Sequence, residues 1–330
     1  MIVVPPLTSR KLLFSMAGQH PVPSQESGNL APWIDKEAAL NGLQSLDLRP
    51  WHIVIVYDQF DEDGDNVHSG VLEELWAAPK KYRISYTSDN LNQTDYGTEK
   101  GLFRLGDQRW PSPAEIQIRE EVVEPFSFAA TLKDFHATNT ERSFGIHKLD
   151  CVLLEREPAT VGDPSQYCFE HGGSVLRYSQ GTGWHQTTYN DITSLQGRNI
   201  AREVEVTDAG KPYLRLVVKT LERIPQVDEN DFLPPPSAVS LQGKRQSGVI
   251  LRPVRSEPPE WPNSLRSQHF SVMVEIVTGK DGHVVSAHAV SGPLDAYKSA
   301  KKTARKWIFQ PYLVLGEPAE VESRIILSNN

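Results

Sequence analysis

The sequence contains no long hydrophobic run. No stretch approaches the roughly 18 to 20 consecutive apolar residues that a membrane-spanning helix requires. Hydrophobic residues nevertheless make up 38% of the chain, which is enough to build buried cores. We therefore expect a globular chain without a membrane span, and its 330 residues favour two domains over one.

Motifs of nucleotide-binding and esterase sites are also missing. The chain has neither a glycine-rich phosphate loop nor a Gly-x-Ser-x-Gly nucleophile elbow. Asp61, Asp63 and Asp65 alternate as calcium ligands do, but Gly64 stands between them and the acidic residue that closes a calcium loop is absent. The ten histidines are scattered along the chain. The sequence predicts no enzyme, no cofactor and no metal site, and a solvated hairpin turn at residues 61–65.

An excess of basic residues is lacking as well. The net charge is -8, whereas binding to nucleic-acid phosphates requires clustered Lys and Arg in excess. The charge is unevenly distributed, since residues 1–249 carry a net charge of -10 and residues 250–330 carry +2. An acidic body with a mildly basic end argues against a nucleic-acid partner and favours two units with different partners.

Cysteine is scarce, because Cys151 and Cys168 are the only two. A lone pair this close in sequence indicates one disulfide, which would stabilise the fold by about 3 kcal/mol on the chain-entropy model. The alternative is two buried free thiols. The disulfide interpretation is favoured, and it indicates an oxidising, extracytoplasmic compartment such as the periplasm.

Alternating apolar and polar residues dominate residues 31–224. Trp51, Ile53, Ile55 and Tyr57 share one face of a strand predicted at residues 51–60. Further strand-like runs lie at residues 71–76, 82–86, 91–96, 102–105, 145–155, 174–178, 184–192, 199–206 and 213–221. Short strands at such regular spacing predict one long antiparallel sheet.

Two helices are expected to cover this sheet. The first has Asp35 as its cap and stops before Pro50. The second starts at Ser112, where Pro113 suits the first helical position and Glu115 closes a capping box, and a helical or mixed stretch continues to about residue 142. Residues 1–30 contain four prolines and no periodicity, so they are predicted to be a disordered tail.

Proline marks the predicted domain boundary. Eight prolines occur between Pro225 and Pro262, so the chain there is expected to be extended and semi-rigid, with a linker at residues 225–247. Beyond it, alternation at residues 270–277 and 283–290 predicts a hairpin, and an apolar stripe from Leu294 to Trp307 predicts a helix packed on it. With a last strand at residues 321–327, residues 248–330 form a compact three-stranded α+β domain.

Two motifs distinguish this second domain. Residues 280–284 read Lys-Asp-Gly-His-Val, and residues 304–311 read Ala-Arg-Lys-Trp-Ile-Phe-Gln-Pro. With these motifs, residues 248–328 resemble the C-terminal domain of TonB-family proteins. Two departures are Phe270, where the family usually has Gly, and Leu327-Ser328, which replace the usual closing Phe.

The TonB resemblance implies a partner-binding edge. In that family, an extended peptide of an outer-membrane transporter adds to the last strand of the domain. The corresponding residues here are Val321, Glu322, Ser323, Arg324, Ile325, Ile326 and Leu327. The resemblance implies an outer-membrane transporter or another envelope protein as the partner, and the alternatives are an edge blunted by its own charges or a homodimer formed through the same strand.

The larger domain carries a less specific resemblance. Residues 69–76 lead into a second run at residues 79–83, and residues 101–106 read Gly-Leu-Phe-Arg-Leu-Gly. These segments resemble LolA-like periplasmic carrier and sensor domains, which implies a strongly curved antiparallel half-barrel with covering helices, holding a lipid or lipoprotein ligand. The aromatic residues that would line its concave face are Trp51, Trp76, Tyr82, Tyr86 and Phe103. The favoured alternative is that these aromatics are ordinary core residues.

Two functional hypotheses follow from these resemblances. The first is a periplasmic TonB-like protein of the α+β class that binds envelope partners by β-strand addition, in energy-coupled transport. The alternative is a lipid or lipoprotein carrier or sensor of the LolA type, docked through its C-terminal module.

Overall fold

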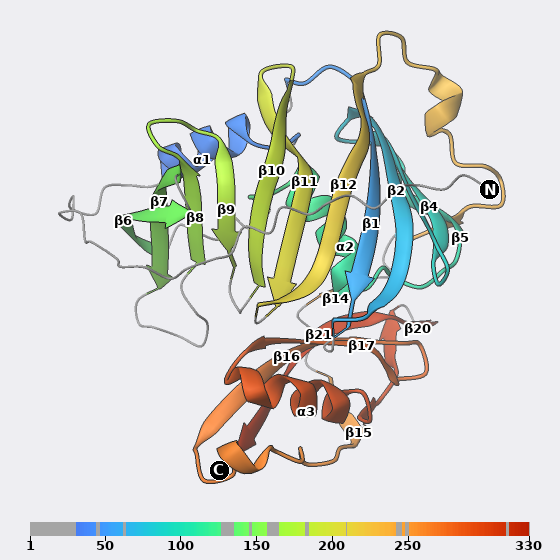
Figure 1. The fold of residues 1–330 in the computed structure, drawn as a ribbon. Coiled ribbons are helices and arrows are strands. Elements are labelled where there is room, and N and C mark those ends of the chain that lie inside the picture. Colours follow the sequence, from blue (N-terminus) through green and yellow to red (C-terminus); the bar gives the residue numbers. More distant parts are fainter. Residues whose placement is uncertain are drawn as a thin grey trace, which may run out of the picture.

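The computed structural model describes residues 31–329, apart from 44–46, 62–63, 127–134, 145–146, 157–164, 182–184, 209, 242–245, 248–250 and 315–316. The predicted disordered tail at residues 1–30 lies outside the described residues. Most of the described chain forms antiparallel sheet, with few helices (Figure 1).

The larger part is one open, curved antiparallel sheet. Its thirteen described strands follow the order β13-β5-β4-β3-β2-β1-β12-β11-β10-β9-β8-β7-β6, so nearly all neighbours are also consecutive in sequence. The strands are β1 Trp51–Phe60, β2 Asn66–Ala78, β3 Lys81–Ser88, β4 Asn92–Thr98, β5 Gly101–Gly106, β6 Phe135–Phe144, β7 His147–Arg156, β8 Ser165–Glu170, β9 Leu176–Gln180, β10 His185–Leu195, β11 Arg198–Asp208, β12 Lys211–Arg223 and β13 Val239–Ser240. The single antiparallel sheet predicted from the alternation is therefore confirmed.

Three strands of this sheet were not predicted, and one of them, the short β13, lies in the segment predicted as a linker. β6 lies where a helical or mixed stretch was expected, so that expectation was wrong, and β8 was not anticipated at all. The sequence of β6 is rich in Thr, Asn, Glu and Arg, so it carries no strong apolar alternation. Its strand conformation depends on pairing with β7 along ten residues.

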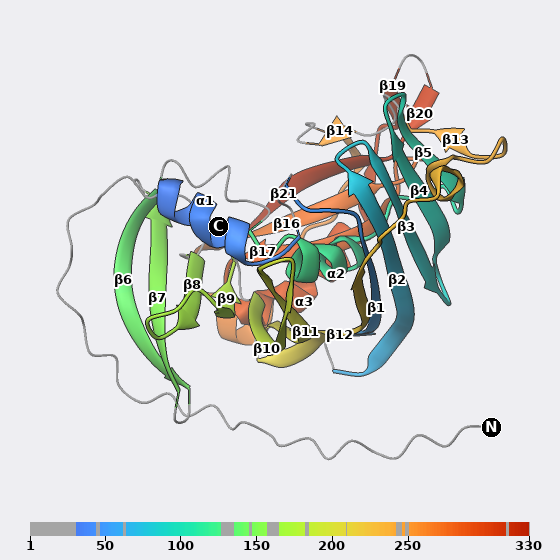
Figure 2. The ribbon, with the colours of Figure 1, turned by 90° about the horizontal axis from the view of Figure 1, so that it is seen from above.

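The inner face of the sheet holds the core. Trp51, Ile53, Ile55 and Tyr57 of β1 are buried, whereas the residues between them are only partly buried. Figure 2 shows the sheet curving around α2, Pro113–Val123, whose Ile118 and Val122 are buried in the same core. Burial of one face on a helix explains the period-two pattern of the strands.

The start of α2 confirms the predicted cap. The Glu115 backbone N–H donates to Ser112 Oγ at 3.3 Å, and the Ser112 N–H donates to Glu115 Oε2 at 2.6 Å. A capping side chain of this kind contributes about 1 kcal/mol. The cap predicted for the first helix was wrong, because α1 spans Ala31–Leu40 and Asp35 lies inside it.

The end of α1 is set by contact with the sheet. Asn41 bridges to Asn199 of β11, and Gly42 follows with a φ of 101°. A Cβ at Gly42 would lie 2.7 Å from the Val123 carbonyl oxygen, so the chain passes too close to α2 for a side chain. The helix therefore ends before Leu43, which was expected to belong to it.

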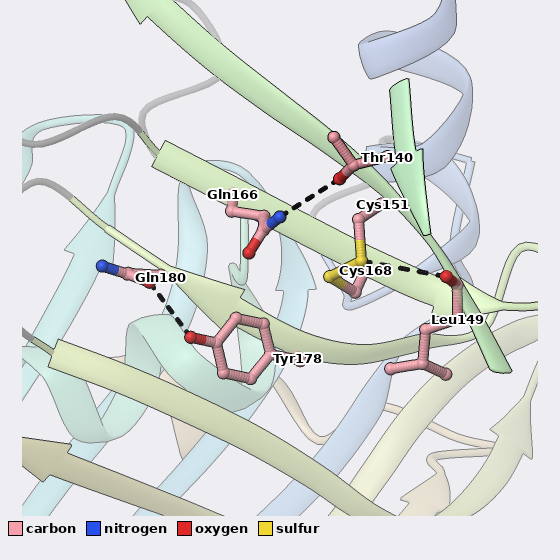
Figure 3. The surroundings of a disulfide bond; sticks show 7 residues. All are labelled: Thr140, Leu149, Cys151, Gln166, Cys168, Tyr178 and Gln180. Carbon is pink, nitrogen blue, oxygen red and sulfur yellow. Dashed lines mark hydrogen bonds between the residues drawn. A yellow bond between two sulfur atoms is a disulfide. The ribbon is translucent and has the colours of Figure 1, made fainter. Parts of the chain in front are cut away.

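Cys151 and Cys168 form the predicted disulfide (Figure 3). They lie directly opposite each other on β7 and β8, and both are buried. The bond joins two strands of the sheet in a small cluster with Leu149 and Tyr178. The alternative of two free thiols was wrong.

The C-terminal residues build a second, smaller sheet. Its order is β14-β21-β16-β17, which adds a short parallel strand to the three that were predicted. The elements of this part are β14 Gln246–Ser247, β15 Pro253–Arg255, η3 Asn263–Leu265, β16 Phe270–Thr278, β17 Val284–Ser291, α3 Leu294–Ala304, β18 Ile308–Phe309, β19 Tyr312–Val314, β20 Glu317–Ala319 and β21 Val321–Asn329. Ala296, Ala300 and Ala304 of α3 are buried against this sheet in a separate core with Val272 and Val274.

The proline-rich segment predicted as a linker lies along the larger sheet. β13 pairs with β5, and the one-turn η2 helix, Glu229–Phe232, contacts β3 and β4. Phe232 is buried, and Lys81 Nζ lies 5.5 Å from the centre of its ring. The segment is thus not extended throughout, and η2 and β13 attach its first half to the larger sheet.

The separate C-terminal core leads to a prediction about folding. A fragment starting near Gly248 should fold alone, because the core around Val272 and α3 is built entirely from residues beyond that point. Cooperative thermal unfolding of the purified fragment, followed by circular dichroism, provides the measurement. A fragment starting at Gln246 serves as the control that retains β14. A disordered Gly248 fragment beside a folded Gln246 fragment would place the boundary before β14.

Candidate functional site

The last strand of the C-terminal sheet offers an incompletely paired edge. On one side, β21 pairs with β16 along nine residues, from Val321 to Asn329. On the other side, β14 reaches only Val321 and Glu322, in parallel register. Among the residues that the structure describes, no strand pairs with this side of β21 from Arg324 onward. Backbone donors and acceptors along such an edge can accept an added strand.

The side chains of β21 divide between two faces. Val321, Ser323 and Leu327 are buried, whereas Arg324 and Ile326 are exposed. Arg324 Nη2 donates to Glu275 Oε1 of β16 at 2.7 Å, so its charge is balanced on the same face. Ile326 is 58% exposed, which is high for a large apolar side chain in a sheet. This stretch of β21 therefore combines a backbone side that no described strand pairs with, an exposed apolar side chain and an ion pair.

The two motifs behind the TonB resemblance meet in the structure. The Phe309 backbone N–H donates to the Gly282 carbonyl at 2.8 Å. Gly282 has a φ of 82°, and a Cβ there would lie 1.9 Å from the Phe309 carbonyl oxygen. Only glycine fits this contact, so the motifs hold the hairpin turn against the segment that follows α3.

Four of the five predicted lipid-facing aromatics belong to the packed core. Trp51 is fully buried and stacks on Trp76 with ring centroids 5.9 Å apart, and Tyr86 is also buried. Burial raises the pKa of the Tyr86 hydroxyl well above its usual value. Tyr82 is partly buried against the same core, and Phe103 is partly buried on β5 opposite Ser240 of β13. The ordinary-core interpretation accounts for these positions.

Sequence reasoning missed a charged network between α2 and the inner face of the sheet. Arg119 donates to both oxygens of Glu74, at 2.7 and 2.9 Å, and also to Glu124. Glu74 is completely buried on β2. Burial acts against the guanidinium, but Glu74 and Glu124 together raise the pKa of Arg119, which stays charged. The acidic and basic residues of α2 carried no signal of this, since such runs usually mark a solvated helix face.

Two further glutamates of α2 have perturbed environments. Burial, followed by the charges of Glu121 and Glu124, raises the pKa of Glu120 to about 7. Glu121 accepts hydrogen bonds from the Tyr189 hydroxyl at 2.7 Å and from Thr187 Oγ1 at 3.1 Å. Burial raises the pKa of Glu121 as well. These contacts join α2 to β10 and supply structural polar links rather than a reacting pair.

One group of described residues could hold a cation. Glu141, Asp150 and His171 each offer a ligand atom, and these atoms lie within 4.8 Å of one another, beside a cavity of about 330 Å³. Both oxygens of Asp150 already have partners, because His171 Nδ1 and the Gly172 N–H each lie 2.8 Å away. Burial opposes these two contacts, which nevertheless lower the pKa of Asp150. The Asp150 carboxylate is thus engaged by protein groups, and the absence of a metal site stays a prediction.

Comparisons with known proteins leave the family open. No family model and no curated protein matches the chain, so both resemblances remain predictions from the sequence. In the part of the chain that the structure describes, no helix is long and apolar enough to cross a membrane.

Three solved structures show distant similarity. A LolA superfamily protein from Nitrosomonas europaea aligns with 11% identity and a TM-score of 0.40, over 62% of this chain and 97% of its own. A DUF1329 family protein from Desulfovibrio piger aligns with 7% identity and a TM-score of 0.34, over 62% and 94% of the two chains. MucB in complex with MucA(peri) aligns with 10% identity and a TM-score of 0.29, over 76% and 70%. Each TM-score lies below 0.5, and we base no conclusion on these similarities.

The buried ion pair of α2 generates a stability prediction. Arg119→Met should lower the free energy of unfolding by about 3 to 5 kcal/mol, because it leaves the fully buried Glu74 carboxylate uncompensated. Adding Glu74→Met should recover part of this loss. Lys80→Met, which breaks an exposed pair with Glu99, is the matched control and should cost less than about 1 kcal/mol. Urea unfolding measures all three variants, and equal costs for Arg119→Met and Lys80→Met would contradict the assignment.

Proposed function

We propose that this protein is a non-enzymatic binding protein of the cell envelope, which captures an extended segment of another envelope protein by adding it as a strand to β21. The observation that carries the proposal is the edge of β21 from Arg324 onward, which no described strand covers. Recognition of this kind uses main-chain hydrogen bonds for affinity and side-chain contacts for specificity.

The surroundings of the edge indicate what an added strand would contact. β14 already pairs with the first two residues on this side of β21, so an incoming segment would pair with the residues that follow them. The exposed face next to it carries Ile326 and the Arg324–Glu275 pair. A segment with an apolar residue opposite Ile326 would bury that side chain, and each added backbone hydrogen bond contributes about 0.5 to 1.5 kcal/mol.

Two features support an envelope partner. The Cys151–Cys168 disulfide is typical of proteins in an oxidising compartment. The TonB resemblance of residues 248–328 implies a peptide from an outer-membrane transporter or a similar envelope protein. Energy coupling lies outside this proposal, since strand addition alone accounts for the geometry.

A second candidate function is transport or sensing of a lipid or lipoprotein. The observation that favours it is the open, curved antiparallel sheet wrapped around α2 (Figure 2), which agrees with the half-barrel implied by the LolA resemblance. The buried positions of Trp51, Trp76 and Tyr86 speak for a filled interior instead. Partner binding through β21 is therefore the main proposal.

Proline substitution tests strand addition directly. Neighbouring residues in a strand direct their N–H groups to opposite sides, so one of Arg324→Pro and Ile325→Pro removes a donor from the open edge and the other removes a bond to β16. The variant that stays folded by circular dichroism should bind an extended transporter-derived peptide at least about tenfold more weakly, which corresponds to roughly 1.4 kcal/mol. Fluorescence anisotropy with the labelled peptide measures the affinity.

Two variants control this experiment. Arg324→Ala should change the affinity less than about threefold, because it keeps the backbone donor. Val285→Pro alters β17, the opposite edge of the same sheet, and should leave binding intact. If the folded proline variant of β21 bound as tightly as the wild type, the partner would bind elsewhere, and the exposed basic face of Lys298, Lys302 and Arg305 on α3 would be the next candidate.

Lipid extraction separates the two candidate functions. Because the core aromatics fill the inner face of the sheet, we expect purified protein to carry far less than one acyl lipid per chain, measured by mass spectrometry of an organic extract. Tyr82→Ala and Phe103→Ala should not change that amount. Stoichiometric lipid in the wild type that is lost in these variants would establish the carrier function instead.

A further inference from the structure

The C-terminal module is docked on the larger sheet through a cluster of rings. Its sheet lies beneath the ends of the long strands, as Figure 1 shows. His288 of β17 contacts His185, the first residue of β10, with ring centroids 4.5 Å apart. Both rings also contact Tyr213 of β12, whose ring centroid lies 5.5 Å from that of His288 and 4.5 Å from that of His185. In a second contact between the two parts, the Trp110 backbone N–H donates to Glu320 Oε2 at 2.7 Å.

The surroundings of the two histidines disfavour a positive charge on either ring. Nε2 of His185 is shielded from water, and no described residue forms a hydrogen bond with it. Lys301 of α3 is only 7% exposed, and its positive charge acts on both rings. Protonation of both histidines would therefore place three cations close together in a poorly hydrated interface, where like charges repel strongly.

Acidic residues also lie around the pair. Asp208 of β11 lies opposite His185 in the sheet register, and Glu275 of β16 lies opposite His288. Glu275 is already paired with Arg324. The charged groups that act on Tyr213 are Asp208, Glu115 and Glu275, and all three are acidic. The charges that shift the two rings are those of Lys301 and, for His288, of His185.

We propose that His185 and His288 form an acid-sensitive latch between the two parts of the chain. With both rings neutral, they pack against Tyr213 and hold the C-terminal module against the larger sheet. With the rings protonated, repulsion and desolvation release the module. The latch is independent of the strand-binding function, because it uses residues away from the open edge of β21.

The pH range follows from the two protonation equilibria. Burial, then Lys301, lowers the pKa of His185 to about 4, and burial, His185 and Lys301 lower the pKa of His288 well below its usual range. Undocked rings would titrate near pH 6.5. Because the docked pKa values are the lower ones, docking is strongest above pH 7 and weakens as the pH falls below 6.5. Below pH 6.5, each ring weakens docking by about tenfold per pH unit. Only one of the two units between pH 7.5 and 5.5 lies in that range, so the two rings together should weaken docking by roughly 100-fold.

Two carboxylates at the same interface act in the opposite direction. Burial and nearby acidic groups, Glu322 of β21 among them, raise the pKa of Glu120 to about 7. Burial also raises the pKa of Glu320, which accepts the Trp110 N–H. Their protonation favours docking, so the effect of the histidines is isolated by comparing proteins that differ only at those rings.

Hydrogen exchange of the Trp110 backbone amide measures the opening, since it detects even rare undocked molecules. In the wild-type chain, its protection factor should fall between pH 7.5 and 5.5. In His185→Phe/His288→Phe, which keeps the aromatic stacking without a titratable nitrogen, protection should be about 100-fold higher than in the wild type at pH 5.5 and similar to it at pH 7.5. Each single variant should show about a tenfold difference.

His283→Phe is the matched control, because His283 is an exposed histidine of the same module. It should follow the wild type at every pH. The latch is refuted if the double variant and the wild type show the same pH dependence, or if NMR titration of the ring protons shows His185 and His288 with pKa values near 6.5 in the docked protein. Thermal unfolding of each variant at pH 7.5 verifies that the phenylalanines are accommodated.

Discussion

The pairing of β1 with β12 is the contact on which the larger sheet depends. It joins strands far apart in the sequence, from Trp51 opposite Arg223 to Gln59 opposite Leu214. Strands β1 to β5 and strands β6 to β12 could each form from local hairpins, but only the pairing of β1 with β12 joins the two groups into one sheet. β1 becomes a central strand buried on its inner face, which is why its apolar alternation is the clearest in the chain.

A curved sheet with one apolar face must be covered on that face. Here α2 fills the concave side with Ile118 and Val122, while Arg119 reaches Glu74 on β2. A buried ion pair adds little stability compared with apolar groups, but it tolerates few alternative positions of the helix. Together with Glu121 and its bond to Tyr189, it aligns α2 with strands on both sides of the β1–β12 pair.

The second sheet faces a different constraint, because three long strands leave two edges and an uncovered face. α3 covers one face, and the ring cluster of His288, His185 and Tyr213 brings the other face against the larger sheet. At the edge formed by β21, β14 pairs with only the first two residues of the strand. The module therefore meets the larger sheet through one of its faces, and no described strand pairs with the outer side of β21 from Arg324 onward.

Local sequence determined much of this molecule. The alternation of Trp51 to Tyr57, the capping box at Ser112 and the hairpin around Gly282 depend on residues within a few positions of each other, and the structure contains all three. The disulfide could be predicted because only two cysteines exist. The polar strand β6 and the end of α1 could not be predicted, since pairing with β7 and contact with β11 override weak local preferences.

Tertiary structure alone decided which distant side chains meet. Glu74 and Arg119 looked like ordinary surface charges, and His185 and His288 were two of ten scattered histidines. The same holds for Gln246 and Ser247, which pair with Val321 and Glu322 at the start of β21. Periodicity reveals which face of an element is buried, because burial of that face repeats along the element. It does not reveal the partner across the interface, because that depends on how separate elements pack.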